Sequence, residues 1–398
     1  MPTMTSEVIR TGSKYVPWGD DGTYGLFPQR MVEAYQKSKT LRSVLTQKAS
    51  LVAANPMTEG ARLLRKIESS VSQRKDQDLR ALMYRVALDY NLHGEGFLLE
   101  VRYIDGSVET SYAEHLDASF VRFANDFDGW LRPRGVWASP NWAHYTRREY
   151  RPVHYPLSHT GEWKVEELED GRVKKSRVIR VEDYEPGKQV YGRGNWTGAY
   201  YDAILEPELP RWNYTHLMNS IHLSGILYVK SLQAASDENR DELVDTLRRQ
   251  LKGEHVHGPS TPIVTGDEDD ELKFLQYTLP TDGAFKDLNA TCERNIIMAA
   301  GMHPALMGVA EPGKLGNTRE IEQHHRRVMA FEIEPLQQKI IRAYGKTLVS
   351  PFAEEFKTYG IGFENRSPVS AADYVSQDFI DRVIPEDEVK KDLGYAAN

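Results

Sequence analysis

The sequence predicts an α+β protein, in which groups of helices and groups of strands share one chain. Apolar residues recur at helical spacing on both sides of a glycine-rich segment between Phe285 and Leu348. Two other stretches, 97–113 and 162–181, have the pattern of two strands each. Each is divided by an Asp-Gly pair, Asp105-Gly106 and Asp170-Gly171, which favours a β-hairpin turn. These observations together predict the fold class.

Length and composition bound the class of protein further. The 398 residues suffice for a sizeable core and two or three domains, and 40% hydrophobic with 27% charged residues is ordinary for a folded soluble protein. The formal net charge of −8 argues against a general nucleic-acid binder, which would neutralise phosphates with Lys and Arg. It leaves open a surface past which DNA slides, because like charge keeps phosphates from sticking.

The cell compartment also follows from the sequence. The single cysteine, Cys292, excludes an internal disulfide and fits a reducing compartment. The first ten residues have no apolar segment of the kind found in signal peptides. No apolar run approaches the ~18 residues of a membrane span. We therefore expect no membrane partner.

The N-terminal part predicts an arm followed by three helices. Residues 1–27 are polar and glycine-rich, which is typical of an extended arm. Its aromatic anchors are Tyr15, Trp18, Tyr24 and Phe27. Pro28 suits a helix start, and a second helical pattern runs to about Ala54. A third helix spans about 76–92, with Gly94 placed to end it in the left-handed conformation.

The middle of the chain predicts a second hairpin, then a helix that leads into strands. Pro207 and Pro210 should make the helix that follows Gly198 start late or kink. A strand is expected from Ser224 to Val229. Further elements are a polar helix over 237–251 and strands over 262–265 and 272–277.

The central helices flank an irregular loop. His303-Pro304 ends the first helix, because a residue before proline is disfavoured in the α region. The loop spans 305–316, and Asn317 is placed to cap the next helix. Pro335 should kink that helix. A short strand at 361–363 and helices over 370–383 and 384–394 complete the prediction.

The residue pattern of the central stretch resembles that of one protein family. Met298-Ala-Ala-Gly-Met-His-Pro-Ala-Leu-Met-Gly308 is similar to a segment of tailed-bacteriophage portal proteins that ends a helix. In that family a Gly/Asn loop and a "Phe…Pro-x-Gln" helix follow. Here those are Gly313-Lys-Leu-Gly-Asn317 and Phe331-Glu-Ile-Glu-Pro-Leu-Gln-Gln338. The resemblance rests on the order of such pieces along nearly the whole chain.

The resemblance implies a division into five parts. They are an N-terminal wing (1–125), a clip-like insertion (126–192), a stem helix (193–223), a C-terminal wing with a tunnel loop near 305–318 (224–350) and a short helical crown (351–398).

The resemblance also implies a function. We expect a ring of twelve copies at one capsid vertex, with a central channel for double-stranded DNA during packaging and ejection. Implied partners are the terminase large subunit, a head-tail adaptor and the major capsid protein or scaffold. The protein would catalyse nothing and need no cofactor or metal. It would be assembled in the host cytoplasm and end in the virion. Another phage connector or capsid protein is the first alternative.

The tunnel loop is also the place where an enzymatic alternative arises. Gly308-Val-Ala-Glu-Pro-Gly313-Lys314 has the spacing of a phosphate-binding P-loop. Leu315 follows where the motif needs a hydroxyl, and Pro312 removes a backbone donor. A P-loop-like NTPase is therefore the lesser alternative. In the portal interpretation, the candidate DNA-contacting residues of the loop are Lys314, Asn317 and Arg319.

One basic run stands out in the second predicted hairpin. Its candidate docking residues for a packaging motor or adaptor are Arg172, Lys174, Lys175 and Arg177. On a strand, 172 and 174 face one side, whereas 175 and 177 face the other. The alternative is a solvated hairpin balanced by its own acidic residues, from Glu166 to Asp170. The histidines offer no set of three or four converging metal ligands.

Overall fold

In the computed structural model, the residues described are 13–18, 26–53, 56–57, 63, 78–128, 132–184, 190–218, 225–230, 263–266, 272–276, 282–309, 318–363 and 365. The chain divides into two compact units. The first contains Met1–Tyr200 and Asn295–Asn398, and the second contains Tyr201–Arg294.

The three helices expected in the N-terminal part are confirmed, although the third begins at Leu79 and not at about 76. They are α1 (Phe27–Lys37), α2 (Lys39–Val52) and α4 (Leu79–His93). Pro28 lies in the first turn of α1, where its missing N–H costs nothing. Asp78 caps α4 by accepting from the Ala81 N–H. Gly94 ends it with φ 82°, as expected.

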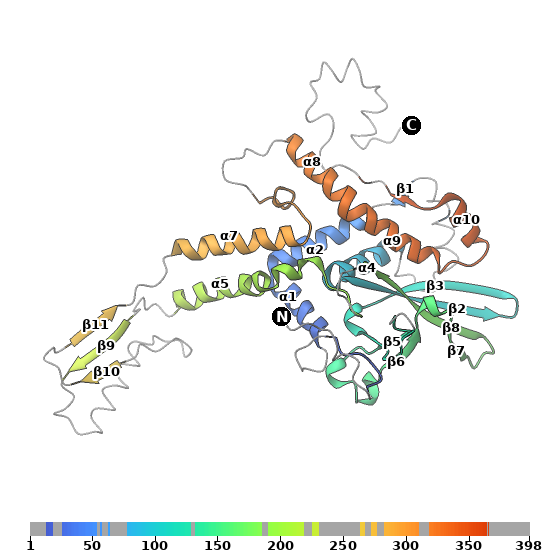
Figure 1. The fold of residues 1–398 in the computed structure, drawn as a ribbon, viewed down its shortest axis with the longest axis horizontal. Coiled ribbons are helices and arrows are strands. Elements are labelled where there is room, and N and C mark those ends of the chain that lie inside the picture. The colour runs from blue at the N-terminus through green and yellow to red at the C-terminus, as the bar shows by residue number, and fades with distance from the viewer. Residues whose placement is uncertain are drawn as a thin grey trace, which may run out of the picture. The chain divides into compact units, whose positions relative to one another are not determined.

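Four antiparallel strands form the largest sheet, in the order β3-β2-β8-β7 (Figure 1). Their bounds are β2 (Glu95–Asp105), β3 (Val108–Leu116), β7 (Lys164–Glu167) and β8 (Val173–Glu182). Gly106 and Gly171 have φ 58° and 82°, a conformation that glycine adopts without strain, and they turn the two hairpins. Both predicted hairpins are therefore confirmed.

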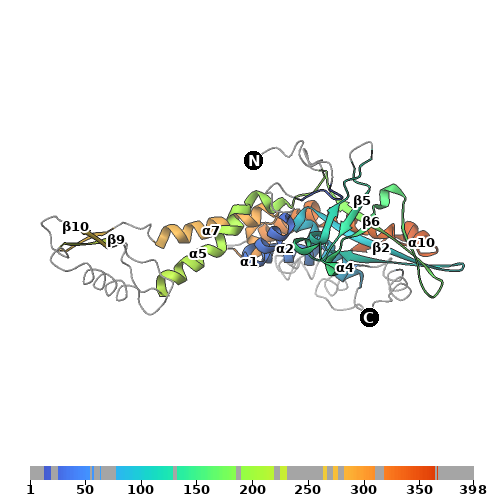
Figure 2. The same ribbon diagram turned by 90° about the horizontal axis from the view of Figure 1, so that it is seen from below.

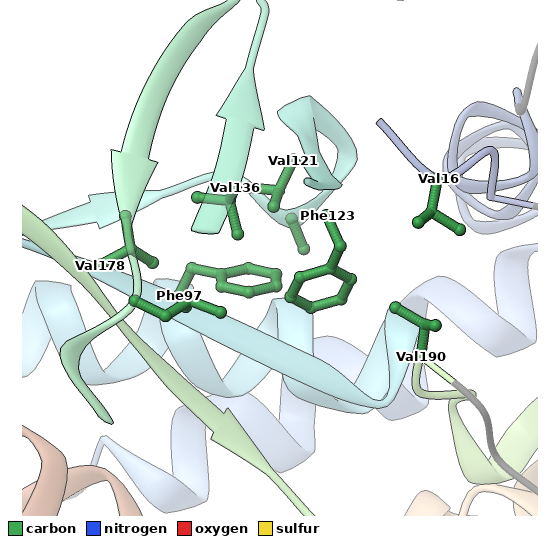
Figure 3. Packing of buried hydrophobic residues seen from close by; sticks show 9 residues of the cluster. Val16, Phe97, Val121, Phe123, Val136, Val178 and Val190 are labelled. Atoms are coloured by element: carbon green, nitrogen blue, oxygen red, sulfur yellow. The ribbon is translucent and has the colours of Figure 1, made fainter. Parts of the chain in front are cut away.

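A second sheet contains three antiparallel strands, β4 (Val121–Phe123), β5 (Gly135–Ala138) and β6 (Val153–Pro156). A hydrophobic core lies between the two sheets (Figure 3). Its labelled members are Val16, Phe97, Val121, Phe123, Val136, Val178 and Val190. Each such side chain contributes about 1.5–3 kcal/mol when it is fully buried. The opposite face of the larger sheet packs on α4 and on α9 (Glu334–Gly345).

Short 3₁₀ turns lie between these strands and, in the case of the last one, between β8 and the helix that follows. They are η1 (Ala118–Phe120), η2 (Trp142–His144), η3 (Arg148–Tyr150), η4 (Ser158–Thr160) and η5 (Asn195–Ala199).

The segment 126–192, interpreted from the sequence as a clip-like insertion, does not form a sheet of its own. It supplies β5, β6, β7 and β8, and β8 pairs with β2 from Ile104↔Val173 to Glu95↔Glu182. It belongs to the same compact unit as the N-terminal residues. The segment joins this unit because β8 buries side chains on both faces of the larger sheet.

The expected N-terminal arm is anchored by aromatic side chains. The Val16 N–H donates to the Phe123 carbonyl at 2.8 Å, and the Tyr191 hydroxyl donates to the Val16 carbonyl at 2.5 Å. Trp18 stacks on the Tyr191 ring with centroids 4.3 Å apart. Phe27 begins α1 instead of extending the arm. The other predicted anchor, Tyr24, lies outside the described residues.

The central helices follow the predicted helix-loop-helix order. They are α7 (Asp282–Ala299), a 3₁₀ turn η6 (Pro304–Met307), α8 (Thr318–Val328) and α9. Between α8 and α9 the kink expected at Pro335 takes the form of a π turn, η7 (Met329–Ile333). The Glu334 N–H donates to the carbonyl of Met329, five residues back. Proline favours such a widened turn because its nitrogen cannot donate.

The C-terminal part contributes α10 (Phe352–Tyr359) and β12 (Gly362–Phe363), which confirms the short strand. β12 pairs with β1 (Pro56–Met57). The predicted helices over 370–383 and 384–394 lie outside the described residues.

The second unit contains α5 (Tyr200–Met218) beside α7 (Figure 1 and Figure 2). Pro207 and Pro210 were expected to make this helix start late or kink. The late start is wrong, since α5 begins at Tyr200 and contains both prolines, whereas the kink stays a prediction. The thiol of buried Cys292 bonds to the Asp202 carboxylate, and burial raises the pKa of this thiol to about 11.

A three-stranded sheet, in the order β10-β9-β11, belongs to the same unit. Its strands are β9 (Gly225–Lys230), β10 (Ile263–Gly266) and β11 (Leu272–Gln276). They confirm the strands expected in this region. The helix predicted over 237–251 falls on residues that the structure does not describe. None of the helices described here is long and apolar enough to cross a membrane.

Candidate functional site

The candidate site is the junction from which the predicted tunnel loop departs. The chain leaves through Met302 and η6, and it re-enters at the first turn of α8. Of the predicted DNA contacts, Lys314 and Asn317 lie outside the described residues. Arg319 lies in that first turn of α8.

Two histidines meet at this junction. The rings of His303, before η6, and His324, on α8, are stacked with centroids 3.4 Å apart and planes 11° apart. The His303 Nδ1 accepts from the N–H of Ala305, the second residue of η6. His324 Nε2 lies 3.6 Å from a Glu320 carboxylate oxygen. The stack therefore joins the two chain ends that bracket the segment.

A buried lysine joins the end of α7 to the π turn that follows α8. Lys48 of α2 is 3% exposed, and its ammonium donates to the Ala300 carbonyl at 2.7 Å. It also donates to Glu332 Oε2 at 2.9 Å. Ala300 follows the last residue of α7, and Glu332 lies in the π turn. Gly301 makes the approach possible, because a Cβ there would lie 2.7 Å from Glu332 Oε2.

Gln337 of α9 makes a second link to α2. Its side chain is 1% exposed, and Nε2 donates to the carbonyls of Leu51 and Val52 at 3.3 and 3.2 Å. These carbonyls end α2, and that of Leu51 also accepts from the Ala53 N–H. Nε2 also donates to Asn365 Oδ1 at 3.0 Å. Helix α2 is thus fixed to the π turn at one point and to α9 at another.

Sequence reasoning did not assign roles to Lys48 and Gln337, although each left a signal. Lys48 occupies a position on an otherwise apolar helical stripe, where a lysine must be paired if it is buried. Gln337 is the glutamine of the "Phe…Pro-x-Gln" pattern. The aromatic of that pattern, Phe331, is 74% exposed.

The candidate docking residues of the basic run lie on β8 and its turn, and most are paired within the hairpin. Arg172 binds Asp170 at 2.6 Å, and Lys174 lies 3.4 Å from Glu166. These contacts match the solvated-hairpin alternative. Lys175 is half-buried on the strand.

Arg177 differs from its neighbours because it is bound inward. Its Nε donates to Glu100 Oε2 at 2.6 Å, and the Glu100 side chain has no exposed surface. Arg102 binds the other oxygen of Glu100 at 2.7 Å. The guanidinium groups of both arginines lie over the Trp163 ring, at 4.0 and 4.7 Å from its centroid. The structure therefore does not bring the four docking candidates to one free surface.

Within the described part of the chain, no group of three or more His, Cys, Asp or Glu side chains is arranged to hold a metal ion. The junction offers structural contacts: charge-assisted hydrogen bonds that fix helix ends.

No protein-family model matches the chain. In sequence it is similar to two uncharacterised proteins of Rickettsia. One, from Rickettsia bellii (strain RML369-C), is 27% identical over 149 residues. The other, from Rickettsia felis (strain ATCC VR-1525 / URRWXCal2), is 28% identical over 153 residues. The matches span 37% and 38% of this chain, and equal shares of these relatives' own length.

Similarity to solved structures extends over nearly the whole chain. A chain in the neck of an empty gene transfer agent (GTA) particle is 14% identical with a TM-score of 0.53, and the match covers 100% of this chain and 98% of that one. A chain in the neck of the native GTA particle, computed with C12 symmetry, is 15% identical with a TM-score of 0.50, covering 98% and 94%. An HK97-family phage portal protein from Corynebacterium diphtheriae is 12% identical with a TM-score of 0.48, covering 87% and 97%.

At these identities the likenesses show the fold alone. The α+β fold predicted from the sequence is confirmed, and the chain shares it from end to end with chains of the GTA neck.

Proposed function

We propose that this chain, which has a portal-like α+β fold, is a phage portal protein. Copies would form a ring at one capsid vertex, and double-stranded DNA would pass through its channel during packaging and ejection. The observation that carries the proposal is the match over 98% of this chain to a chain in the neck of the native GTA particle, computed with C12 symmetry. Twelve subunits are proposed from this symmetry together with the family resemblance, whereas the neck of the empty particle was computed with C6 symmetry.

Physical properties of the chain support this role. Copies that meet through unlike surfaces close into a ring when the rotation between them allows it. A net charge of −8 suits a channel wall past which DNA slides without sticking. The junction of α7, η6 and α8 holds both ends of the segment that contains Lys314 and Asn317. These two residues and Arg319 remain the proposed DNA contacts.

The proposed partners are a terminase large subunit, a head-tail adaptor and the major capsid protein or scaffold. The docking residues proposed from the basic run are Arg172, Lys174 and Lys175. Arg177 is left out of this set because it is bound to Glu100. The clip-like part is better sought in the separate compact unit, 201–294, than in 126–192. The protein would assemble in the host cytoplasm, catalyse nothing and end in the virion.

The test of the proposal is the mass and shape of the purified protein, by light scattering and electron microscopy. Annular particles near twelve times 45.4 kDa, with an axial hole wide enough for a DNA duplex, would support it. A monomer that stays monomeric with capsid protein present, or that binds nucleotide, would overturn it. Shells, or flat rings without a stem, would favour another connector or capsid protein.

A deletion tests the proposed loop. Removing 309–316 is expected to leave ring assembly intact and to reduce DNA packaging. The matched control is replacement of the same residues by a Gly-Ser segment of equal length, which keeps the chain connection and removes Lys314. Loss of ring assembly in both variants would show that the segment is structural.

A further inference from the structure

Lys48 is a buried charge on an otherwise apolar face of α2. Lysines are almost never fully buried unless they are paired, because removing an ammonium from water is costly. Lys48 is 3% exposed, yet α2 has apolar residues elsewhere on the same face, including Val44 and Val52. A methionine or leucine would fill such a position at lower cost. The ammonium must therefore be explained by what it binds.

Both partners of this ammonium come from the central helices. The Ala300 carbonyl follows the carboxyl end of α7, where unpaired carbonyls carry partial negative charge. Glu332 brings a full negative charge from the π turn. The partners lie 252 and 284 residues from Lys48 along the chain. A single donor group thus fixes two distant chain segments to α2.

The surrounding backbone is shaped to admit this contact. Gly301 has φ +77°, and any side chain at this position would strike the Glu332 carboxylate. The π turn aims Glu332 toward α2 while the neighbouring Phe331 remains exposed. Two unusual backbone features, a left-handed glycine and a π turn, therefore converge on one lysine.

We propose that Lys48 is a positioning residue, whose ammonium holds the end of α7 and the π turn at a fixed separation. The segment proposed to contact DNA leaves after the first of these and returns at the start of α8, whose other end is the π turn, so the inference rests on the proposed function. The lysine acts through the helices and touches no DNA. Its role is to fix the π turn, and with it the carboxyl end of α8, relative to the end of α7 in every subunit.

Three variants separate positioning from stability. Lys48→Met keeps the length of the side chain and removes both charge-assisted bonds. Lys48→Met combined with Glu332→Gln also removes the carboxylate that the first variant leaves without its partner. Glu332→Gln alone removes the charge of the acceptor but keeps an amide oxygen that can accept from Lys48, so it serves as the test if Lys48→Met does not fold. The control is Lys37→Met, which breaks the exposed Lys37–Glu33 pair of α1.

Amide hydrogen exchange measures the junction directly. Peptides covering 298–303 and 329–334 should exchange about tenfold faster or more in Lys48→Met, because charge-assisted bonds there are lost. The β2 peptide 97–104 should be unchanged, and Lys37→Met should change neither. The double variant should stay fast at the junction. If it exchanges as slowly as the native protein, the stranded carboxylate alone caused the effect, and the proposal is wrong.

Particle assays then test the consequence for DNA. Rings of Lys48→Met should assemble at native mass, and capsids built on them should protect less DNA from nuclease. Normal DNA protection in spite of fast exchange at the junction would overturn the proposal. If the native protein itself forms no ring, the proposed function fails, and the exchange measurement still decides whether Lys48 fixes the junction.

Discussion

Replacing Arg177 by methionine is expected to destabilise the four-stranded sheet, although this arginine belongs to a basic run that suggests docking. The Glu100 side chain, with no exposed surface, accepts from Arg177 Nε at 2.6 Å. Arg177 itself is only 15% exposed. The variant leaves a buried carboxylate with one partner fewer and also removes a guanidinium from the Trp163 ring.

The magnitude follows from these contacts. Removing the sole partner of a buried charge costs about 3–5 kcal/mol. Arg102 still binds the other Glu100 oxygen at 2.7 Å. We therefore expect about 2–3 kcal/mol, in the range for hydrogen bonds to charged groups. Lys174→Met is the matched control on the same strand, because its pair with Glu166 is one-third exposed and 3.4 Å long. It should cost about 0–1 kcal/mol.

Thermal unfolding of the two variants gives the comparison. A cost of about 2–3 kcal/mol lowers Tm by roughly 4 °C or more in a large domain. Lys174→Met should lie within about 2 °C of the native protein. Equal small shifts in both variants would refute the reasoning, since Arg177 would then be available for a partner. Binding of a partner to Lys174→Met and Arg177→Met, measured at a temperature where both are folded, completes the test.

Two further predictions concern buried polar groups. Gln337→Leu should cost about 1–3 kcal/mol in thermal unfolding, because the carbonyls that end α2 lose the Gln337 donor. The exposed neighbour substitution Gln338→Leu should stay within about 0.5 kcal/mol, and equal costs would contradict the role given to Gln337. Burial lowers the pKa of His93, so the unfolded chain binds this proton more readily and stability should fall as pH drops below about 6.5. The slope from this group is at most about 1.4 kcal/mol per pH unit, and Tm measured between about pH 7.5 and about pH 5.5 should vary less in His93→Phe. An unchanged slope would show that other groups carry the effect.

Local signals in the sequence predicted local structure well. The Asp-Gly pairs turned both hairpins, and Gly94 ended α4, because each requires only the conformation of a few residues. The prolines of α5 show the opposite case. Pro207 and Pro210 lower the intrinsic preference for helix, yet the helix continues through them. Packing against neighbouring residues overrides such preferences, and a local rule cannot include it.

Pairing between distant segments could not be predicted in the same way. Alternation in 172–181 placed Arg177 on one face of a strand, but it did not identify Glu100 as the residue opposite. The same holds for the candidate site. The sequence located the helix-loop-helix and the proline kink, whereas the bonds from Lys48 join residues that only the folded chain brings together.

The anchoring of Val16 has a consequence for how the chain is made. Its carbonyl oxygen accepts a hydrogen bond from the Tyr191 hydroxyl, which lies 175 residues further along the chain. At a synthesis rate of about 5–20 residues per second, the ribosome needs roughly 9–35 s to reach that tyrosine. The Val16 carbonyl therefore lacks this donor until about 175 further residues have been made. During this interval the exposed tyrosine, valine and tryptophan of 15–18 are open to chaperones, and slowing translation before Tyr191 should lengthen that exposure.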